Sequence, residues 1–216
     1  MNSVSSKKPW FEFLSEWIPA KLPGEKVHAE LSPLRMLSSE ALKEAKIIKE
    51  SAVAIHLFEK DDDLQIILTQ RNTYVGAHSG QVSFPGGKMD DSDLNLIHTA
   101  KRESYEEIGI SVDEGKLIGP LTEIYIPVSK FRVTPYVFFH EQAVQNLMPN
   151  PREVESIFFL PRLSLISDEL LIKKDIVIST NFTLKDVPCF SFKEYTIWGA
   201  TAILLNELKH ILKENS

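Results

Sequence analysis

The chain has 216 residues, 43% hydrophobic and 25% charged, a composition typical of a globular protein. Its net charge of −6 gives no reason to expect general nucleic-acid binding, and no apolar run reaches the length of a membrane span. A single cysteine, Cys189, excludes an intramolecular disulfide, and the first residues lack the apolar segment of a signal peptide. These features predict a cytoplasmic protein without a membrane partner.

Prolines interrupt residues 1–36, and we interpret this segment as an N-terminal extension to a domain at residues 37–216. The extension contains large apolar side chains at helical spacing, which predict one short amphipathic helix: Trp10, Phe11, Phe13, Leu14, Trp17 and Ile18. This aromatic face must be buried, either against the main domain or against a second subunit. The second interpretation predicts a homodimer.

The rest of the chain alternates between strand and helix patterns. Expected helices run from a cap at Ser38 or Ser39 to Glu50, and over residues 93–108, 163–167 and 201–212. For the second of them, the expected cap is Ser92 or Asp93 and the expected left-handed stop is Gly109. Expected strands cover residues 51–58 and 64–70, which form a hairpin, and 82–84, 116–118, 121–127, 133–140, 154–160, 182–184 and 190–192. Strands and helices mixed in this way predict an α/β or α+β sandwich.

Three glutamates stand close together in the second of these helices. Glu103, Glu106 and Glu107 have the spacing i, i+3 and i+4, so one helix face carries all three. We expect them to face away from the inward side of the helix, which is formed by Leu96, Ile97, Ala100, Ser104 and Ile108. Such a cluster is either a solvated helix face or an acidic site with a counter-charge, and a hard divalent cation suits oxygen ligands. Gly86 and Gly87 lie upstream in a turn where bare backbone can approach a ligand closely. Together these features predict a metal site on a loop–helix unit.

The same stretch resembles the Nudix box. Residues 102–110 read Arg-Glu-Ser-Tyr-Glu-Glu-Ile-Gly-Ile and match its second half, with a serine in a usually apolar place. Arg102 follows Gly87 by 15 positions, one more than in the general motif, and Asp90 and Asp93 stand between them. This variant is similar to the coenzyme A pyrophosphatase branch of the Nudix hydrolases.

Further blocks extend this resemblance over roughly residues 50–212. The blocks in register are Leu68-Thr69-Gln70-Arg71, His78, Gly80, Phe84-Pro85-Gly86-Gly87, Phe131-Arg132-Val133-Thr134-Pro135, Glu153-Val154-Glu155 and Trp198-Gly199-Ala200-Thr201-Ala202. The chain departs from the branch at two positions: Gly76 replaces its second arginine and Asn72 replaces a serine.

The resemblance implies a Nudix fold, with a mixed sheet between helices, and a requirement for Mg²⁺ or Mn²⁺. It implies hydrolysis of the diphosphate in a small-molecule nucleotide, with coenzyme A or a derivative as the favoured substrate. The expected products are 4′-phosphopantetheine and adenosine 3′,5′-bisphosphate. Two alternatives stay open: a pyrophosphatase for a nucleotide sugar, ADP-ribose or a dinucleotide, and a Nudix module that senses a nucleotide without cutting it.

The resemblance also suggests roles for individual side chains. The expected metal ligands are Glu103, Glu106 and Glu107; Glu106 or Glu107 is a candidate general base, although the family often uses other carboxylates. Arg102 is expected to fix a carboxylate through a bidentate pair. The remaining candidates for substrate contact are Arg71, His78, Gly86, Gly87 and Lys88. Helix capping explains Asp90, Asp91 and Asp93 more simply than metal binding does.

Overall fold

The computed structural model describes residues 8–32, 36–72, 80–111, 113–179 and 182–215. Within these ranges an eight-stranded mixed sheet contains β1 (Lys49–Lys60), β2 (Asp63–Arg71), β3 (Val82–Ser83), β4 (Gly86–Lys88), β5 (Lys116–Pro120), β6 (Ile124–Ile126), β7 (Phe131–His140) and β8 (Val154–Pro161). A second, three-stranded sheet contains β9 (Leu171–Ser179), β10 (Phe182–Phe192) and β11 (Tyr195–Ile197). The helices are α1 (Trp10–Trp17), α2 (Glu25–His28), η1 (Ala29–Leu31), α3 (Ser38–Glu44), α4 (Leu96–Ile108), α5 (Arg162–Ile166), η2 (Asp168–Leu170) and α6 (Gly199–Lys213).

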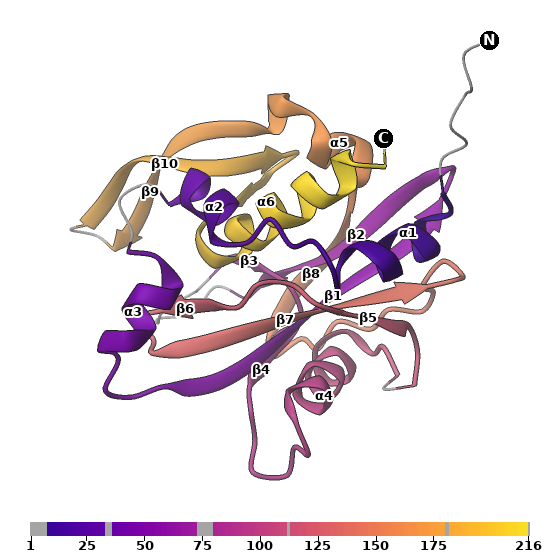
Figure 1. Cartoon of the computed structure of the whole chain (residues 1–216), viewed down its shortest axis with the longest axis horizontal. Helices are drawn as coiled ribbons and strands as arrows, with labels where there is room; N and C mark the ends of the chain where they lie inside the picture. Colours follow the sequence, from indigo (N-terminus) through magenta and orange to yellow (C-terminus); the bar gives the residue numbers. More distant parts are fainter. Residues whose placement is uncertain (1–7, 33–35, 73–79, 112, 180–181, 216) are drawn as a thin grey trace.

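The large sheet lies between helices, as predicted. Helix α4 packs on one face through a small cluster that includes Ala100 and, from β1 and β7, Ala52 and Phe138. The main core lies on the other face, where α6 contributes a run of buried apolar residues that includes Leu205 and Leu208. Figure 1 shows α4 and α6 on opposite sides of the strands. The predicted mixed sheet between helices is therefore confirmed.

The predicted hairpin of β1 and β2 is also present. Lys60 pairs with Asp63 at its end, and both turn residues have positive φ angles, 52° for Asp61 and 60° for Asp62. Aspartate tolerates this left-handed conformation better than most residues do, so the turn suits the sequence.

The helix expected to end at Glu50 ends at Glu44 instead. Residues 49–58 form a parallel ladder with β7, and this long-range pairing extends β1 backward into the predicted helix. The predicted serine cap is wrong too, because the hydroxyl of Ser38 accepts a hydrogen bond from the backbone N–H of Tyr125 at 2.9 Å.

The aromatic face of α1 packs against the same chain. Phe13, Leu14 and Ile18 are buried in the main core, and Phe11 packs on Phe139 of β7. The main domain therefore buries this face, as one of the two interpretations predicted. The face gives no reason to expect a homodimer. No helix among the described residues is long and apolar enough to cross a membrane.

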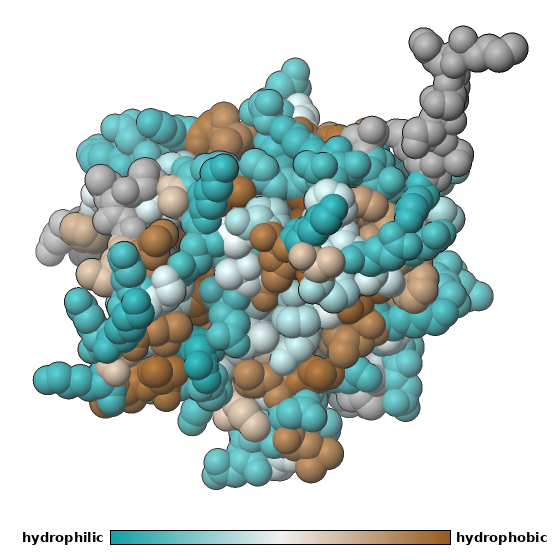
Figure 2. Space-filling view, viewed as in Figure 1, coloured by the Kyte–Doolittle hydropathy of each residue, from teal (hydrophilic) through white to brown (hydrophobic). Residues whose placement is uncertain are grey.

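The second sheet was only partly predicted. The two strands expected around Pro188 are one strand, β10, with a bulge between Leu184 and Val187. Its neighbours β9 and β11 were missed, because polar and apolar residues do not alternate cleanly along exposed β9. Figure 2 shows hydrophilic and hydrophobic side chains interspersed over the face in view.

Candidate active site

Helix α4 begins at Leu96, and its cap is Asn95 rather than the predicted Ser92 or Asp93. The side-chain oxygen of Asn95 accepts a hydrogen bond from the backbone N–H of His98 at 2.9 Å. At the other end, Gly109 has φ 78° and ψ 10°, the left-handed stop predicted from the sequence. The helix that carries the glutamates is therefore defined at both ends by local hydrogen bonds and backbone conformation.

Asp93 does not cap the helix because it binds Arg102. One carboxylate oxygen accepts from Nε of Arg102 and the other from Nη2, both at 2.9 Å, in a bidentate pair. Thr99 and the backbone N–H of Asp90 also donate to this buried carboxylate. The guanidinium holds the pKa of Asp93 far below its usual range. The pair has the geometry expected for Arg102, and the carboxylate that it fixes is Asp93.

The same guanidinium also gathers two of the three glutamates. Its Nη1 donates to Glu103 at 2.8 Å and to Glu106 at 3.1 Å, while Nη2 donates to the backbone carbonyl of Lys88 at 3.2 Å. The Glu103 side chain is largely buried, whereas that of Glu106 is half exposed. Arg102 thus ties Asp93, the glycine turn and helix α4 into one unit, and Lys88 contributes its carbonyl to it.

Glu107 points into the protein. We expected the glutamates to face away from the inward side of α4, and for Glu107 this is wrong, since the residue is 2% exposed. Its carboxylate lies 3.4 Å from Nη1 of Arg71 and receives a backbone hydrogen bond from Gly86. The pKa of Glu107 is raised to about 8: burial raises it most, Arg71 lowers it, and the charges of Glu103 and Glu153 raise it.

The two glycines of the turn are held against neighbouring atoms. A Cβ on Gly86 would lie 2.4 Å from the carbonyl oxygen of Ala52, and its φ of 156° also favours glycine. A Cβ on Gly87 would lie 2.5 Å from a carboxylate oxygen of Glu103. Bare backbone at Gly87 is therefore what lets β4 and the Glu103 carboxylate approach each other.

The donor set of this site suits a hard divalent cation. Burial raises the pKa of Glu103 as well as that of Glu107, so two carboxylates sit where their negative charge lacks full compensation. In the described part of the chain, however, no three acidic, histidine or cysteine side chains converge around one point. The reason is visible in the ion pairs: Arg102 holds Glu103 and Glu106, while Arg71 holds Glu107.

One acidic residue near the site was absent from the predicted candidates. The negative charge of Glu153 raises the pKa of both Glu103 and Glu107, so this carboxylate lies near the cluster, at the residue before β8. Its only signal in the sequence was its place in a late block of the resemblance. His78 and Gly76, in contrast, lie outside the described residues.

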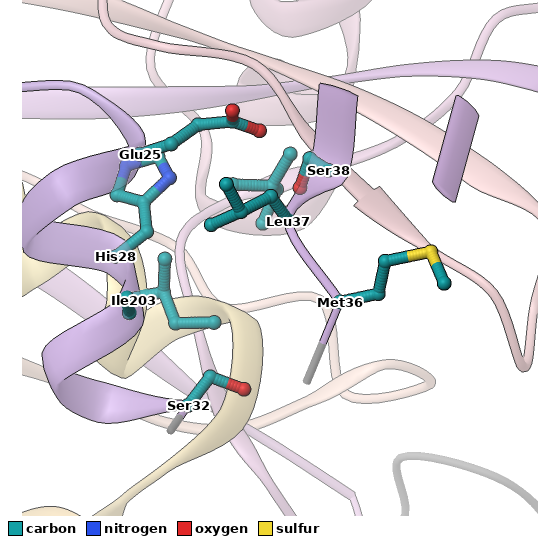
Figure 3. Close-up of a pocket in the computed structure, with 9 residues that line it drawn as sticks. Glu25, His28, Ser32, Met36, Leu37, Ser38 and Ile203 are labelled. Atoms are coloured by element: carbon teal, nitrogen blue, oxygen red, sulfur yellow. The ribbon is translucent and has the colours of Figure 1, made fainter. Parts of the chain in front are cut away.

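A cavity beside the N-terminal helices is too small for a nucleotide. Its volume is about 20 Å³, which is room for one water molecule. Figure 3 shows its lining, with His28 and Ser32 on one side and Met36 and Leu37 on the other. None of the residues that line it comes from α4 or the glycine turn, so the cavity is separate from the acidic cluster.

Comparison with known proteins identifies the family. Residues 48–178 match the model of the NUDIX domain. Nudix hydrolase 15, mitochondrial, of Arabidopsis thaliana is 36% identical over 169 residues, which is 73% of this chain. The chain spans little more than half the length of that relative, 56%. The human protein named mitochondrial coenzyme A diphosphatase NUDT8 is 30% identical over 81% of this chain and 74% of its own length.

The solved structures agree on the fold. A MutT/nudix family protein from Enterococcus faecalis superposes with a TM-score of 0.52 over 88% of this chain and 74% of its own, at 14% identity. At that identity the likeness concerns the fold alone. The sequence match and the fold lead to one conclusion: the chain belongs to the Nudix hydrolase family.

Proposed function

We propose that the chain hydrolyses the diphosphate bond of a nucleoside diphosphate derivative, and that its substrate is coenzyme A or one of its derivatives. The main support is the pair of buried carboxylates, Glu103 and Glu107, against the turn of Gly86 and Gly87. Burying such acids is unfavourable unless a cation compensates them, so this arrangement supports metal binding.

Glu103 and Glu107 would hold the metal, with Glu106 at the solvent side of the same helix face. Mg²⁺ or Mn²⁺ held there would supply neutralisation of phosphate charge and a lowered pKa for a bound water. The role of Arg102 is to position Glu103 and Glu106 through its own anchor on Asp93. The half-exposed side chain of Glu106 can leave Arg102 at little cost, since exposed ion pairs contribute little stability.

Arg71 is the proposed contact to the substrate diphosphate. Its Nη1 faces Glu107, while its buried Nε has no hydrogen-bond partner among the described residues. A buried donor without a partner is costly, and a phosphate oxygen would satisfy it. Arg71 would therefore contact both Glu107 of the acidic cluster and the diphosphate of the substrate.

Glu153 is the carboxylate that we propose as the general base. It lies near Glu103 and Glu107, outside helix α4, and makes no ion pair with Arg71 or Arg102 in the described part of the chain. Glu106 and Glu107, in contrast, are engaged by arginines. A base must be able to reach a proton without first giving up another partner, which favours Glu153.

The choice of coenzyme A rests on the spacing of Gly87 and Arg102, on the upstream block that contains Arg71, and on the relative named coenzyme A diphosphatase. Gly76, in place of the branch's second arginine, favours testing other nucleotides beside coenzyme A.

A sensor that binds a nucleotide without cutting it is the alternative from another functional class. The complete set of carboxylates disfavours it, since a pure binder has no use for them all.

The remaining proposals concern location and partners. We propose a cytoplasmic protein that acts on a small molecule and binds neither nucleic acid nor a membrane, in keeping with its net charge of −6 and single cysteine. The Arabidopsis and human relatives described above are both named mitochondrial, so fractionation of the source cells is the direct test.

The test of function is a substrate panel with Mg²⁺ that compares coenzyme A, ADP-ribose, NADH and diadenosine polyphosphates. Coenzyme A should have the highest kcat/KM, and its cleavage should stop when EDTA removes the metal. If coenzyme A is the slowest substrate by a wide margin, the substrate proposal is wrong. If no nucleotide is cleaved but several bind with unchanged affinity in Glu103→Gln, the sensor is correct.

Matched variants test the residues. Glu153→Gln should lower kcat by about 100-fold or more, the usual effect of losing a general base. Glu155→Gln, an exposed acid two residues further on in β8, is its control and should leave kcat unchanged. Glu107→Gln should abolish turnover and weaken Mn²⁺ binding, measured by electron paramagnetic resonance. Undiminished turnover of Glu107→Gln at saturating metal would remove Glu107 from the site.

A further inference from the structure

A groove of about 420 Å³ lies where the ends of β2 and β3 meet the three-stranded sheet. This volume lies in the range of small-molecule sites, roughly 300–1,000 Å³. The groove is separate from the acidic cluster, because no residue of α4 lines it. The side chains that matter below are Gln70, Gln81, Lys174, Val177, Thr196 and Trp198.

The groove begins one residue away from the acidic cluster. Gln70 lines it, and the next residue, Arg71, contacts Glu107 on the other side of the strand. Neighbouring side chains of a strand point to opposite faces, and their Cα atoms are about 3.8 Å apart. Only the end of β2 therefore separates the groove from the proposed diphosphate site. A ligand that lies across the end of β2 would contact both the groove and the proposed diphosphate site.

The charges in the groove disfavour a second phosphate. One cation, Lys174, lines it together with two anions, Asp175 and Glu194. The Lys174 ammonium donates to the hydroxyls of Ser191 at 3.4 Å and Thr196 at 3.1 Å. No arginine lines the groove among the described residues, so the bidentate donor typical of phosphate sites is absent there.

The lining suits an uncharged chain that carries amides. The side-chain amides of Gln70 and Gln81 are of the kind that donates and accepts hydrogen bonds, as an amide ligand requires. Val177 and Trp198 add apolar surface to the same lining. A lining that combines amide groups with apolar surface matches a chain of methylenes and amides better than a sugar, which presents hydroxyls along its whole length.

We propose that this groove binds the uncharged, amide-bearing arm of the substrate, while the diphosphate lies at Arg71 and the carboxylates. The proposal deepens the proposed function and rests on it for the place of the diphosphate. It assigns substrate specificity to the three-stranded sheet, whose strands β10 and β11 lie beyond the residues matched by the family model.

The experiment blocks the groove without touching the acidic cluster. Val177 is 72% exposed and lines the groove, so Val177→Trp fills it with little effect on the core. The matched control is Leu163→Trp, because Leu163 is 57% exposed and lies beyond the opposite end of β8. The ligand is pantetheine, which has the amide arm but no diphosphate, and its binding is measured by isothermal titration calorimetry.

Pantetheine should bind the wild-type chain and Leu163→Trp equally, and Val177→Trp about tenfold more weakly, the effect of losing one good pocket contact. For turnover, Val177→Trp should lower kcat/KM for coenzyme A and dephosphocoenzyme A alike and leave ADP-ribose unchanged. If coenzyme A is cleaved but Val177→Trp binds pantetheine as the wild type does, the groove proposal is wrong and the function stands. If coenzyme A is not cleaved while pantetheine binding depends on Val177, the groove proposal stands and the substrate proposal fails.

Discussion

A buried pair of histidines beneath α4 should make the protein lose stability in mild acid. His56 Nδ1 lies 2.9 Å from His140 Nε2, and His56 Nε2 lies 2.9 Å from the hydroxyl of Ser104. That hydroxyl donates its proton to the carbonyl of Ala100, so His56 must donate to Ser104 and accept from His140. This arrangement needs an unprotonated Nδ1 on His56, so the ring of His56 is neutral.

The pKa values indicate the size of the effect. Burial lowers the pKa of His140 from 6.5 to about 4, and burial together with the neighbouring ring lowers the pKa of His56 well below 6.5. Because the folded pKa is below the unfolded value, the unfolded chain binds the extra proton first. The stabilisation is complete above pH 6.5 and disappears as the pH falls towards 4. For His140 alone, the loss from pH 8 to pH 5 is about 2 kcal/mol.

The test variant is His140→Gln, which keeps a donor for His56 but does not titrate. Urea unfolding at pH 8 and pH 5 gives the free energy of unfolding of both proteins. The wild type should lose about 2 kcal/mol more than the variant over this interval. Groups that titrate away from His140 are common to both proteins and cancel, so the difference reports on the pair of His56 and His140. Equal losses would refute the assignment of neutral, buried histidines, whatever the stability of the variant at pH 8.

Three further predictions follow from the contacts of single residues. Gly87→Ala should displace the Glu103 carboxylate and lower kcat about 100-fold, the usual effect of a misplaced catalytic group, with a nearly unchanged free energy of unfolding. Full activity would show that the close approach is dispensable. Asp93→Asn should lower both kcat and the free energy of unfolding, the latter by about 3 kcal/mol, because Arg102 loses its buried partner. A loss of activity alone would contradict the structural role of this pair. Glu207→Ala should destabilise the chain by about 4 kcal/mol in urea unfolding, because this buried carboxylate accepts four hydrogen bonds. A change below 1 kcal/mol would contradict that count of lost bonds.

The spacing of apolar residues correctly predicted elements that bury one face and expose the other. Helix α6 has apolar residues at helical spacing, and it was found close to its observed limits, Gly199–Lys213. Helix α3 was predicted too long, because residues 49 and 50 pair with Phe131 and Arg132 of β7, far away in the sequence. The pairing of distant strands has no local signature, so a pattern of helical residues could not exclude it.

The site shows the same division between local and distant contacts. The predicted candidates Glu103, Glu107, Gly86 and Gly87 lie together because one loop–helix unit carries them all. Glu153 reaches them only because β8 pairs with β2, where Val154 lies opposite Arg71. Its sequence position carries no information about that pairing.

The two arginines of the site explain why its acids can be buried without a bound metal. Arg102 holds Glu103, and Arg71 faces Glu107, so each buried carboxylate has a cation nearby in the protein itself. The two pairs differ in how firmly they are anchored. Nε and Nη2 of Arg102 both donate to the carboxylate of Asp93, whereas the Nε of Arg71 has no partner within the described residues.

This difference suggests an order of events that follows from electrostatics alone. A guanidinium anchored by a buried aspartate stays in place when a divalent cation binds Glu103, since its bidentate pair is independent of that acid. Arg71 has only the 3.4 Å contact to Glu107 to lose, and a divalent cation at Glu107 would repel it. If the proposed function is correct, the guanidinium would then turn to the diphosphate, and metal and substrate binding would favour each other through one side chain. Measured Mn²⁺ affinity should therefore rise when a non-hydrolysable nucleotide is present, and Arg71→Met should remove that gain.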